Sequence, residues 1–196
     1  MLDENITWFD QIDYLSKKLS RSAGIFSKLR YYVNTNILIK VYHALFNSHL
    51  QYAILCWGSS ATTYINKLQL LQNRAIRNMM KAPRFYRLDN YFLNLRILKV
   101  QDLYNLEVSK FMHGHFNGSL PRRFDDFFRE VNASHNYNTR AARNRNYTTI
   151  SCRSARGQRS IRFCGPKIWN DIPLSQRNLP KLHFKKECKT RILSNY

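Results

Sequence analysis

The chain has 196 residues, of which 44% are hydrophobic, including 12 tyrosines, 12 phenylalanines and 3 tryptophans. This composition excludes a disordered chain and suffices for one domain or two small ones. A formal net charge of +20 at pH 7 favours a polyanionic partner, most often nucleic acid.

The first 100 residues predict a series of amphipathic helices. Apolar residues recur every three or four positions from Ile12 to Val33, which indicates one face of a long helix that Gly24 weakens. Asn34 or Asn36 can cap the next helix. For its buried face we expect a second set: Ile37, Val41, Leu45 and their neighbours.

The apolar run from Tyr52 to Trp57 is consistent with a core helix end or a buried strand, and Cys56 is expected in the core. It is far too short to cross a bilayer. A helix is predicted over residues 63–81, ended by Pro83, and another over residues 100–115. Their inward residues are expected to be: Ile65, Leu68, Leu71, Ala75, Met79, Leu103, Leu106 and Phe111.

The chain changes character after about residue 120. From Val131 to Asn170 there is no acidic residue, and helical periodicity fades until a final helical pattern over residues 179–193. We therefore predict a mainly α protein: a helical bundle over residues 1–120, then a basic, less regular module over residues 121–196 with a terminal helix.

The segment "SIRFCGPKIWNDIP", residues 160–173, is sharply punctuated. Ile161 and Phe163 alternate with Arg162 and Cys164, which predicts a short half-buried strand. Gly165-Pro166 predicts a turn. Trp169 is expected to anchor the segment to the core, together with Ile168 and Ile172, rather than to stack on a base. The residue types indicate no chemistry here.

An ordered set of motifs resembles one protein family: "LDENITW", "IDYLSKKLSRSAGIFSKLRYYV", "VYHALFNSHLQYAILCWG", "LQLLQNRAIRNMM", "LPRRFDDFF", "HNYNTR" and "GPKIWNDIP". The set is similar to the C-terminal, thumb and tail part of reverse transcriptases from non-LTR (LINE-type, jockey-like) retrotransposons. Two positions depart from that family: Ser48 stands where a proline is frequent, and Ala53 where a glycine is frequent.

The resemblance implies a thumb-like fold and a parent RNA-directed DNA polymerase. In that family an aromatic-x-Asp-Asp pattern lies upstream of the first motif and holds two Mg²⁺ ions. Asp125-Asp126 lacks the intervening residue, so we interpret it as an acidic patch between packed aromatic residues. We accordingly expect no polymerase activity, no cofactor and no metal. His113 and His115 are expected to be solvated or capping.

Two basic rows are the strongest candidates for binding. On the predicted helix over residues 63–81, one row holds Lys67, Arg74, Arg77 and Lys81; on the first helix, another holds Lys17, Arg21 and Lys28. Each row is long enough to follow several phosphates of a duplex. The alternative for either row is an ordinary solvated face.

A third candidate lies in "HNYNTRAARNRNY", residues 135–147, where Arg140, Arg143 and Arg145 precede Tyr147. Arginine pairs with phosphates and tyrosine stacks on unpaired bases, so this segment could bind single strands or hairpin loops. The structural alternative, held at equal weight, is that Tyr137 packs on the core and the arginines cap carbonyls or face water.

The sequence therefore favours a non-catalytic, nucleic-acid-binding fragment of a reverse transcriptase, with RNA, DNA or an RNA–DNA hybrid as partner. The alternative is an element-derived host protein with an interaction or structural role. The acidic start lacks a signal pattern, so we expect the nucleus or cytoplasm, with neither secretion nor a transmembrane anchor.

Overall fold

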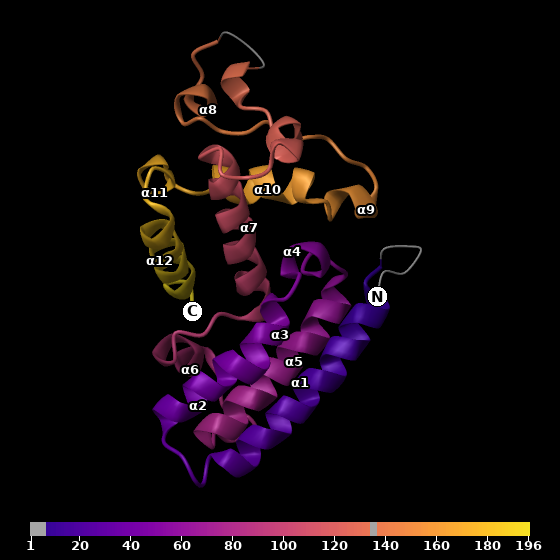
Figure 1. Ribbon diagram of the computed structural model, residues 1–196, viewed down its shortest axis with the longest axis vertical. Coiled ribbons are helices and arrows are strands. Elements are labelled where there is room, and N and C mark those ends of the chain that lie inside the picture. Colours follow the sequence, from indigo (N-terminus) through magenta and orange to yellow (C-terminus); the bar gives the residue numbers. More distant parts are fainter. Residues whose placement is uncertain (1–6, 134–136) are drawn as a thin grey trace. The chain divides into compact units, whose positions relative to one another are not determined.

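The computed structural model describes residues 7–133 and 137–196. The chain is mainly α, as predicted, and divides into two compact units (Figure 1). Unit 1 comprises the chain up to Tyr104 and, in addition, residues 192–196 at the C-terminal end. Unit 2 comprises residues 105–191. This division falls inside a helix, some fifteen residues before the boundary that we placed at residue 120 from composition.

The long helices α1 (Phe9–Leu29) and α5 (Thr62–Met80) pack side by side in unit 1 (Figure 1). They run in the same direction, because Phe9 contacts Tyr64 near their starts and the Asn78 side chain donates to Ala23 near their ends. The predicted buried face of α1 is confirmed from Ile12 to Phe26, although the helix ends at Leu29.

Between α1 and α5 the chain forms α2 (Thr35–Tyr42), a π-helical turn η1 (His43–Asn47), α3 (Ser48–Gln51) and α4 (Ile54–Trp57). Asn34 caps α2, as the sequence allowed: its side chain accepts from the backbone N–H of Ile37.

The predicted buried face of α2 is wrong by one position. Ile37 and Leu45 are exposed, and the core instead receives residues four apart: Leu38, Tyr42, Phe46 and Leu50. Residues spaced by four do not stay on one side of an α-helix, because the helix has 3.6 residues per turn. The wider π-turn corrects this rotation and keeps all four on the core side. The turn also leaves the Leu45 carbonyl able to accept from the Ser22 hydroxyl of α1 at 3.1 Å.

The remainder of unit 1 comprises α6 (Asp89–Asn94), the start of α7 (Val100–Phe116) and the chain end. Gln72 of α5 is fully buried, and its amide donates to the Tyr42 hydroxyl and to the Leu98 carbonyl. The Tyr196 hydroxyl donates to Asp102 and accepts from the Lys99 N–H. These polar links between distant segments fix the register of the unit-1 core.

Unit 2 contains the rest of α7, two 3₁₀ turns, four short or medium helices and most of a terminal helix. In chain order, the elements after α7 are: η2 (Arg122–Phe127), η3 (Val131–Ala133), α8 (Arg140–Arg143), α9 (Ala155–Gln158), α10 (Ile161–Asn170), α11 (Leu174–Arg177) and α12 (Lys181–Leu193). The predicted terminal helix is confirmed, with Phe184 and Cys188 buried.

The predicted strand and turn over residues 161–166 are wrong, because this segment is the first half of α10. The Ser160 side chain caps the helix by accepting from the Arg162 N–H. Gly165 permits a close helix approach: a Cβ there would lie 2.7 Å from the Met112 Sδ and 3.3 Å from a Phe128 ring carbon. Trp169 is fully buried and confirms its predicted anchoring role.

The expectation that Cys56 lies in the core is also wrong. Cys56 is exposed, whereas its neighbour Trp57 is fully buried. In α4 the residues that face the core are Ile54 and Trp57, which are three positions apart and share one side of the helix.

Candidate nucleic-acid interface

The two predicted basic rows lie on α1 and α5, on the sides that face away from the core. Lys17, Arg21 and Lys28 are exposed on α1. On α5 and its C-cap, Lys67, Arg74 and Lys81 are exposed and Arg77 is half-buried. Because α1 and α5 are parallel and packed together, the rows run along the same helix pair.

One carboxylate joins the rows at the helix starts. Asp13 of α1 accepts from Lys17 at 2.9 Å and from Lys67 at 3.0 Å, so it pairs with the first residue of each row. Hydrogen bonds from Lys17 and then Lys67 lower the pKa of the Asp13 carboxyl below its ordinary value. Asp13 is therefore ionised at neutral pH and offsets part of the positive charge at this end.

A tyrosine joins cationic residues at the other end of the helix pair. The Lys81 ammonium lies 4.8 Å from the ring centroid of Tyr31, and the Arg30 guanidinium lies 4.9 Å from the same centroid. Lys81 adopts a left-handed conformation (φ 51°) as the C-cap of α5, which directs the chain away from the helix axis. The exposed Lys81 side chain therefore belongs to the basic surface, where it makes a solvent-exposed cation–π contact with Tyr31.

The α1/α5 surface, defined as the seven residues of the two rows, extends along most of both helices. The α5 row spans about 21 Å and the α1 row about 16 Å at 1.5 Å per residue. Arg21, Lys28 and Arg74 form no ion pair with any residue that the structure describes. Their charge is available to an external anion, in contrast to that of Lys17 and Lys67.

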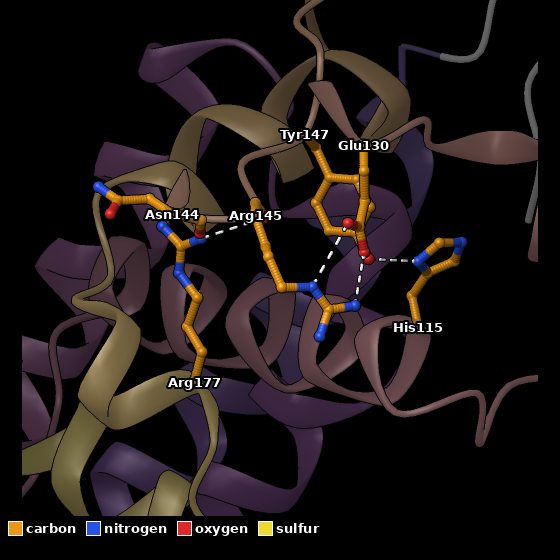
Figure 2. Close-up of polar contacts among 6 residues, drawn as sticks. All are labelled: His115, Glu130, Asn144, Arg145, Tyr147 and Arg177. Carbon is orange, nitrogen blue, oxygen red and sulfur yellow. Dashed lines mark hydrogen bonds and ion pairs between the residues drawn. The ribbon is translucent and has the colours of Figure 1, made fainter. Parts of the chain in front are cut away.

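The third candidate segment divides in the structure. Arg140 and Arg143 begin and end the short helix α8, which Thr139 caps, and both side chains are exposed. Arg145 follows at φ 50° and donates to Glu130 at 2.8 Å (Figure 2). Its guanidinium also lies 4.3 Å from the ring centroid of Phe116. The Arg145 guanidinium is thus already paired with a carboxylate and stacked on an aromatic ring within the chain.

Tyr147 is buried, with 3% of its surface exposed. Its hydroxyl shares a hydrogen bond of 2.7 Å with His115 Nδ1 (Figure 2), and its ring contacts Phe128 and Trp169. Burial raises the pKa of the Tyr147 phenol, with Glu130 contributing in the same direction. No ring face of Tyr147 is open to a base in this conformation, so its predicted role as a stacking residue is wrong. Tyr137, which the structural alternative placed on the core, is instead 78% exposed.

Arg177 is the polar residue that sequence reasoning missed. It is 1% exposed, and burial lowers its pKa. Its guanidinium donates to the Asn144 carbonyl at 2.7 Å (Figure 2). It also donates to the Ile172 carbonyl at 2.7 Å and to the Asn146 side chain at 3.0 Å. A further bond reaches the Asn170 carbonyl. Arg177 therefore supplies donors to backbone carbonyls in the loop after α8 and at the end of α10.

Asn170 gives the segment over residues 160–173 a structural role, because its side chain pairs with the backbone of Tyr147. Its side-chain oxygen accepts from the Tyr147 N–H at 3.0 Å, and its amide donates to the Tyr147 carbonyl at 2.9 Å. Together with Arg177, this two-way pairing attaches residues 144–147 to the end of α10. The two motifs "HNYNTR" and "GPKIWNDIP" thus lead into one internal polar network, whose role is structural.

The histidines predicted to be solvated or capping are instead packed inside unit 2. His113 is 5% exposed, stacks on Phe184 with ring centroids 4.1 Å apart, and bonds to the Leu179 carbonyl. His115 is engaged with Tyr147, as described above. Both lie near the end of α7, where aromatic residues of unit 2 surround them.

Asp125 and Asp126 are exposed within η2, next to Phe124, which packs edge-on against Phe111. This arrangement agrees with our interpretation of an acidic patch between packed aromatic residues. Across residues 7–133 and 137–196, no group of three or more metal-ligating side chains comes together. Within the same residues, no helix is both long and apolar enough to cross a membrane.

Comparison with known proteins gives one informative similarity. Over 88 residues, which are 43% of this chain, the sequence is 32% identical to an RNA-directed DNA polymerase from the mobile element jockey of Drosophila funebris. The match covers 10% of that polymerase, so the chain spans about a tenth of the curated relative's length. No family model matches the chain, and no solved structure matches it. Part of this protein is therefore similar in sequence to a region of a non-LTR retrotransposon reverse transcriptase.

Proposed function

We propose that this chain is a non-catalytic, nucleic-acid-binding part of a non-LTR retrotransposon reverse transcriptase, from the C-terminal thumb and tail region. Its α1/α5 surface would grip the template–primer duplex or the element RNA. The observation that carries the proposal is the presence of two exposed basic rows on one pair of parallel helices. The sequence similarity to an RNA-directed DNA polymerase and the net charge of +20 support it.

The physical basis is electrostatic. Lysine and arginine side chains that neutralise phosphates release condensed counterions, which gives strong binding at low salt and little dependence on base sequence. An A-form hybrid duplex is recognised through its shape, phosphates and 2′-hydroxyls, which suits side chains projecting from a rigid helix pair.

The test measures binding of the full chain to an RNA–DNA hybrid as a function of salt. Changing Arg21, Lys28 and Arg74 to Gln should flatten the slope of log affinity against log salt by about two to three units. The matched control changes Lys181, Lys185 and Lys186 to Gln: these are exposed residues of α12 and carry the same total charge.

The control should change the slope much less. Equal losses in the two variants would mean general charge attraction without a defined surface, and would contradict the proposal. A wild-type chain that does not bind the hybrid at low salt would favour the alternative, an element-derived protein with an interaction or structural role. Primer extension on an RNA template with Mg²⁺ should show no activity; extension above background would contradict the non-catalytic assignment.

A further inference from the structure

Unit 1 has a hollow of about 760 Å³, open to solvent, between α1 and the segment that contains α3. From α1 its lining includes Gln11, Tyr14 and Lys18; from the α3 side it includes Ser48, His49 and Tyr52. Most of the lining surface is apolar, with polar side chains interspersed. Nothing in the fold of unit 1 requires two tyrosines to be displayed here, because the core is filled by other residues.

The two tyrosines leave much of their surface available. Tyr14 is 55% exposed and Tyr52 is 74% exposed. The Lys18 ammonium lies 4.7 Å from the ring centroid of Tyr14, so one aromatic wall of the hollow carries a cation. Exposed tyrosine rings beside a cation are the combination on which unpaired nucleobases stack.

The backbone around Tyr52 is held in a defined and strained turn. Tyr52 (φ −62°, ψ 118°) and Ala53 (φ 51°, ψ 28°) occupy the two central positions of a turn close to type II, whose second position favours glycine. The buried Trp57 donates its indole N–H to the Tyr52 carbonyl at 2.8 Å. These contacts fix where the Tyr52 side chain leaves the backbone.

The hollow lies next to the α1 basic row. Tyr14 precedes Lys17 by three positions and Arg21 by seven, so all three project from neighbouring parts of the same helix surface. A strand whose phosphates contact Arg21 therefore brings its bases toward Tyr14.

We infer that this hollow binds an unpaired nucleobase of the strand whose phosphates lie on the α1 row. The inference rests on the proposed function and specifies its substrate as a duplex with a single-stranded extension. Tyr14 and Tyr52 supply the stacking faces. Gln11, Ser48 and His49 supply polar groups within reach of base edges, and Asp10 at the rim can accept from a base amino group.

A base fits this hollow better than an apolar protein side chain does. The adjoining row is cationic, and Lys18 adds a further positive charge beside the ring of Tyr14. These positive charges attract a nucleic-acid strand, which carries a phosphate at each nucleotide. Stacking on tyrosine is tolerant of base identity. An apolar protein partner would instead place its own surface against these charged groups.

The experiment compares two RNA–DNA hybrids of equal duplex length, one blunt and one with a short unpaired extension containing 2-aminopurine. With the full chain, the extended hybrid should bind about tenfold more tightly than the blunt one. The 2-aminopurine fluorescence should be quenched on binding, because its ring stacks on tyrosine.

Variants locate the effect. Tyr52→Ala should remove most of the advantage of the extended hybrid while leaving blunt-hybrid affinity unchanged, and Tyr52→Phe should retain both the advantage and the quenching. Tyr32→Ala is the matched control, since Tyr32 is 84% exposed and lies outside the hollow. Circular dichroism checks that each variant remains folded.

The outcomes separate the two proposals. Salt-dependent binding of the blunt hybrid, with no added affinity for the extension, would overturn the inference about the hollow and leave the proposed function standing. Equal effects of Tyr52→Ala and Tyr32→Ala would also overturn it. Absence of binding to both hybrids would remove the proposed function and this inference together.

Discussion

In unit 1 the lysines and arginines of α1 and α5 project outward from a helix pair, whereas unit 2 uses two of its arginines internally. Residues 1–100 hold 14 basic side chains and residues 101–196 hold 18, so the two parts look alike by composition. Arg177 nevertheless lies buried among backbone carbonyls, and Arg145 pairs with Glu130.

This difference teaches that net charge overstates the binding surface. A guanidinium can serve a loop as a hydrogen-bond hub, and then it contributes to folding rather than to recognition. The comparison predicts that substitutions in the unit-2 network lower stability, and that substitutions on the α1/α5 surface alter binding.

The largest effect is expected at Tyr147. Tyr147→Ala should lower the free energy of unfolding by about 3–5 kcal/mol, because a buried aromatic ring leaves a cavity. Tyr147→Phe removes only the bond to His115 and should cost about 1 kcal/mol. Denaturant unfolding measures both. Weaker binding to single-stranded RNA at unchanged stability would contradict the structural role and restore Tyr147 as a binding residue.

Arg177 should come next. Arg177→Lys keeps the charge but loses the planar donor fork, so several buried acceptors lose their partners and stability should fall by about 2–3 kcal/mol. The melting temperature of the full chain reports this change. Arg153→Lys, at an exposed position, is the control and should leave the melting temperature unchanged. Equal stability of the two variants would contradict the hub role of Arg177.

On the binding side, Asp13→Asn should strengthen hybrid binding. The change removes a negative charge from the basic surface and releases Lys17 and Lys67, so affinity at low salt should rise several-fold. The slope against salt should steepen by about one to two units. Asp125→Asn makes the same charge change at an exposed site in unit 2 and should have a smaller effect. Identical gains would show that only total charge matters.

The smallest effect is expected at Arg145. Its pairing with Glu130 is half-exposed, with 49% of the Arg145 side chain accessible, so Arg145→Gln should cost about 0.5–1 kcal/mol of stability. Arg143→Gln, two residues earlier and exposed, should cost nothing measurable. A loss of several kcal/mol at Arg145 would mean that this contact organises the loop more strongly than its exposure indicates.

The sequence predicted the helices of unit 1 well where the core side chains are aliphatic. In α1 the spacing from Ile12 to Phe26 leaves one buried face. The sequence-based prediction of the buried face of α2 was wrong because the buried Tyr42 has a polar group and because the π-turn changes the spacing of buried residues. The prediction for residues 161–164 was wrong because four alternating residues do not distinguish a strand from the first turn of a helix.

The basic rows follow from helical spacing, so the residues of the candidate site could be proposed before the structure was known. The burial of Arg177 could not, because two of its acceptors, Asn144 and Asn146, lie 33 and 31 positions earlier in the chain, and no local pattern records them. The hollow beside α1 was missed for the same reason: Tyr14 and Tyr52 come from separate elements.

Gly165 has a consequence for sequences that resemble this one. A turn at Gly165-Pro166 would accept asparagine or aspartate in place of the glycine, whereas in this helix any Cβ would lie 2.7 Å from the Met112 Sδ and 3.3 Å from a Phe128 ring carbon, so these side chains would have to shift. Phe128 also contacts Tyr147, so a shift of its ring would reach the residue that Asn170 holds. Related proteins that keep this architecture should therefore tolerate more variation at most neighbouring positions than at this one.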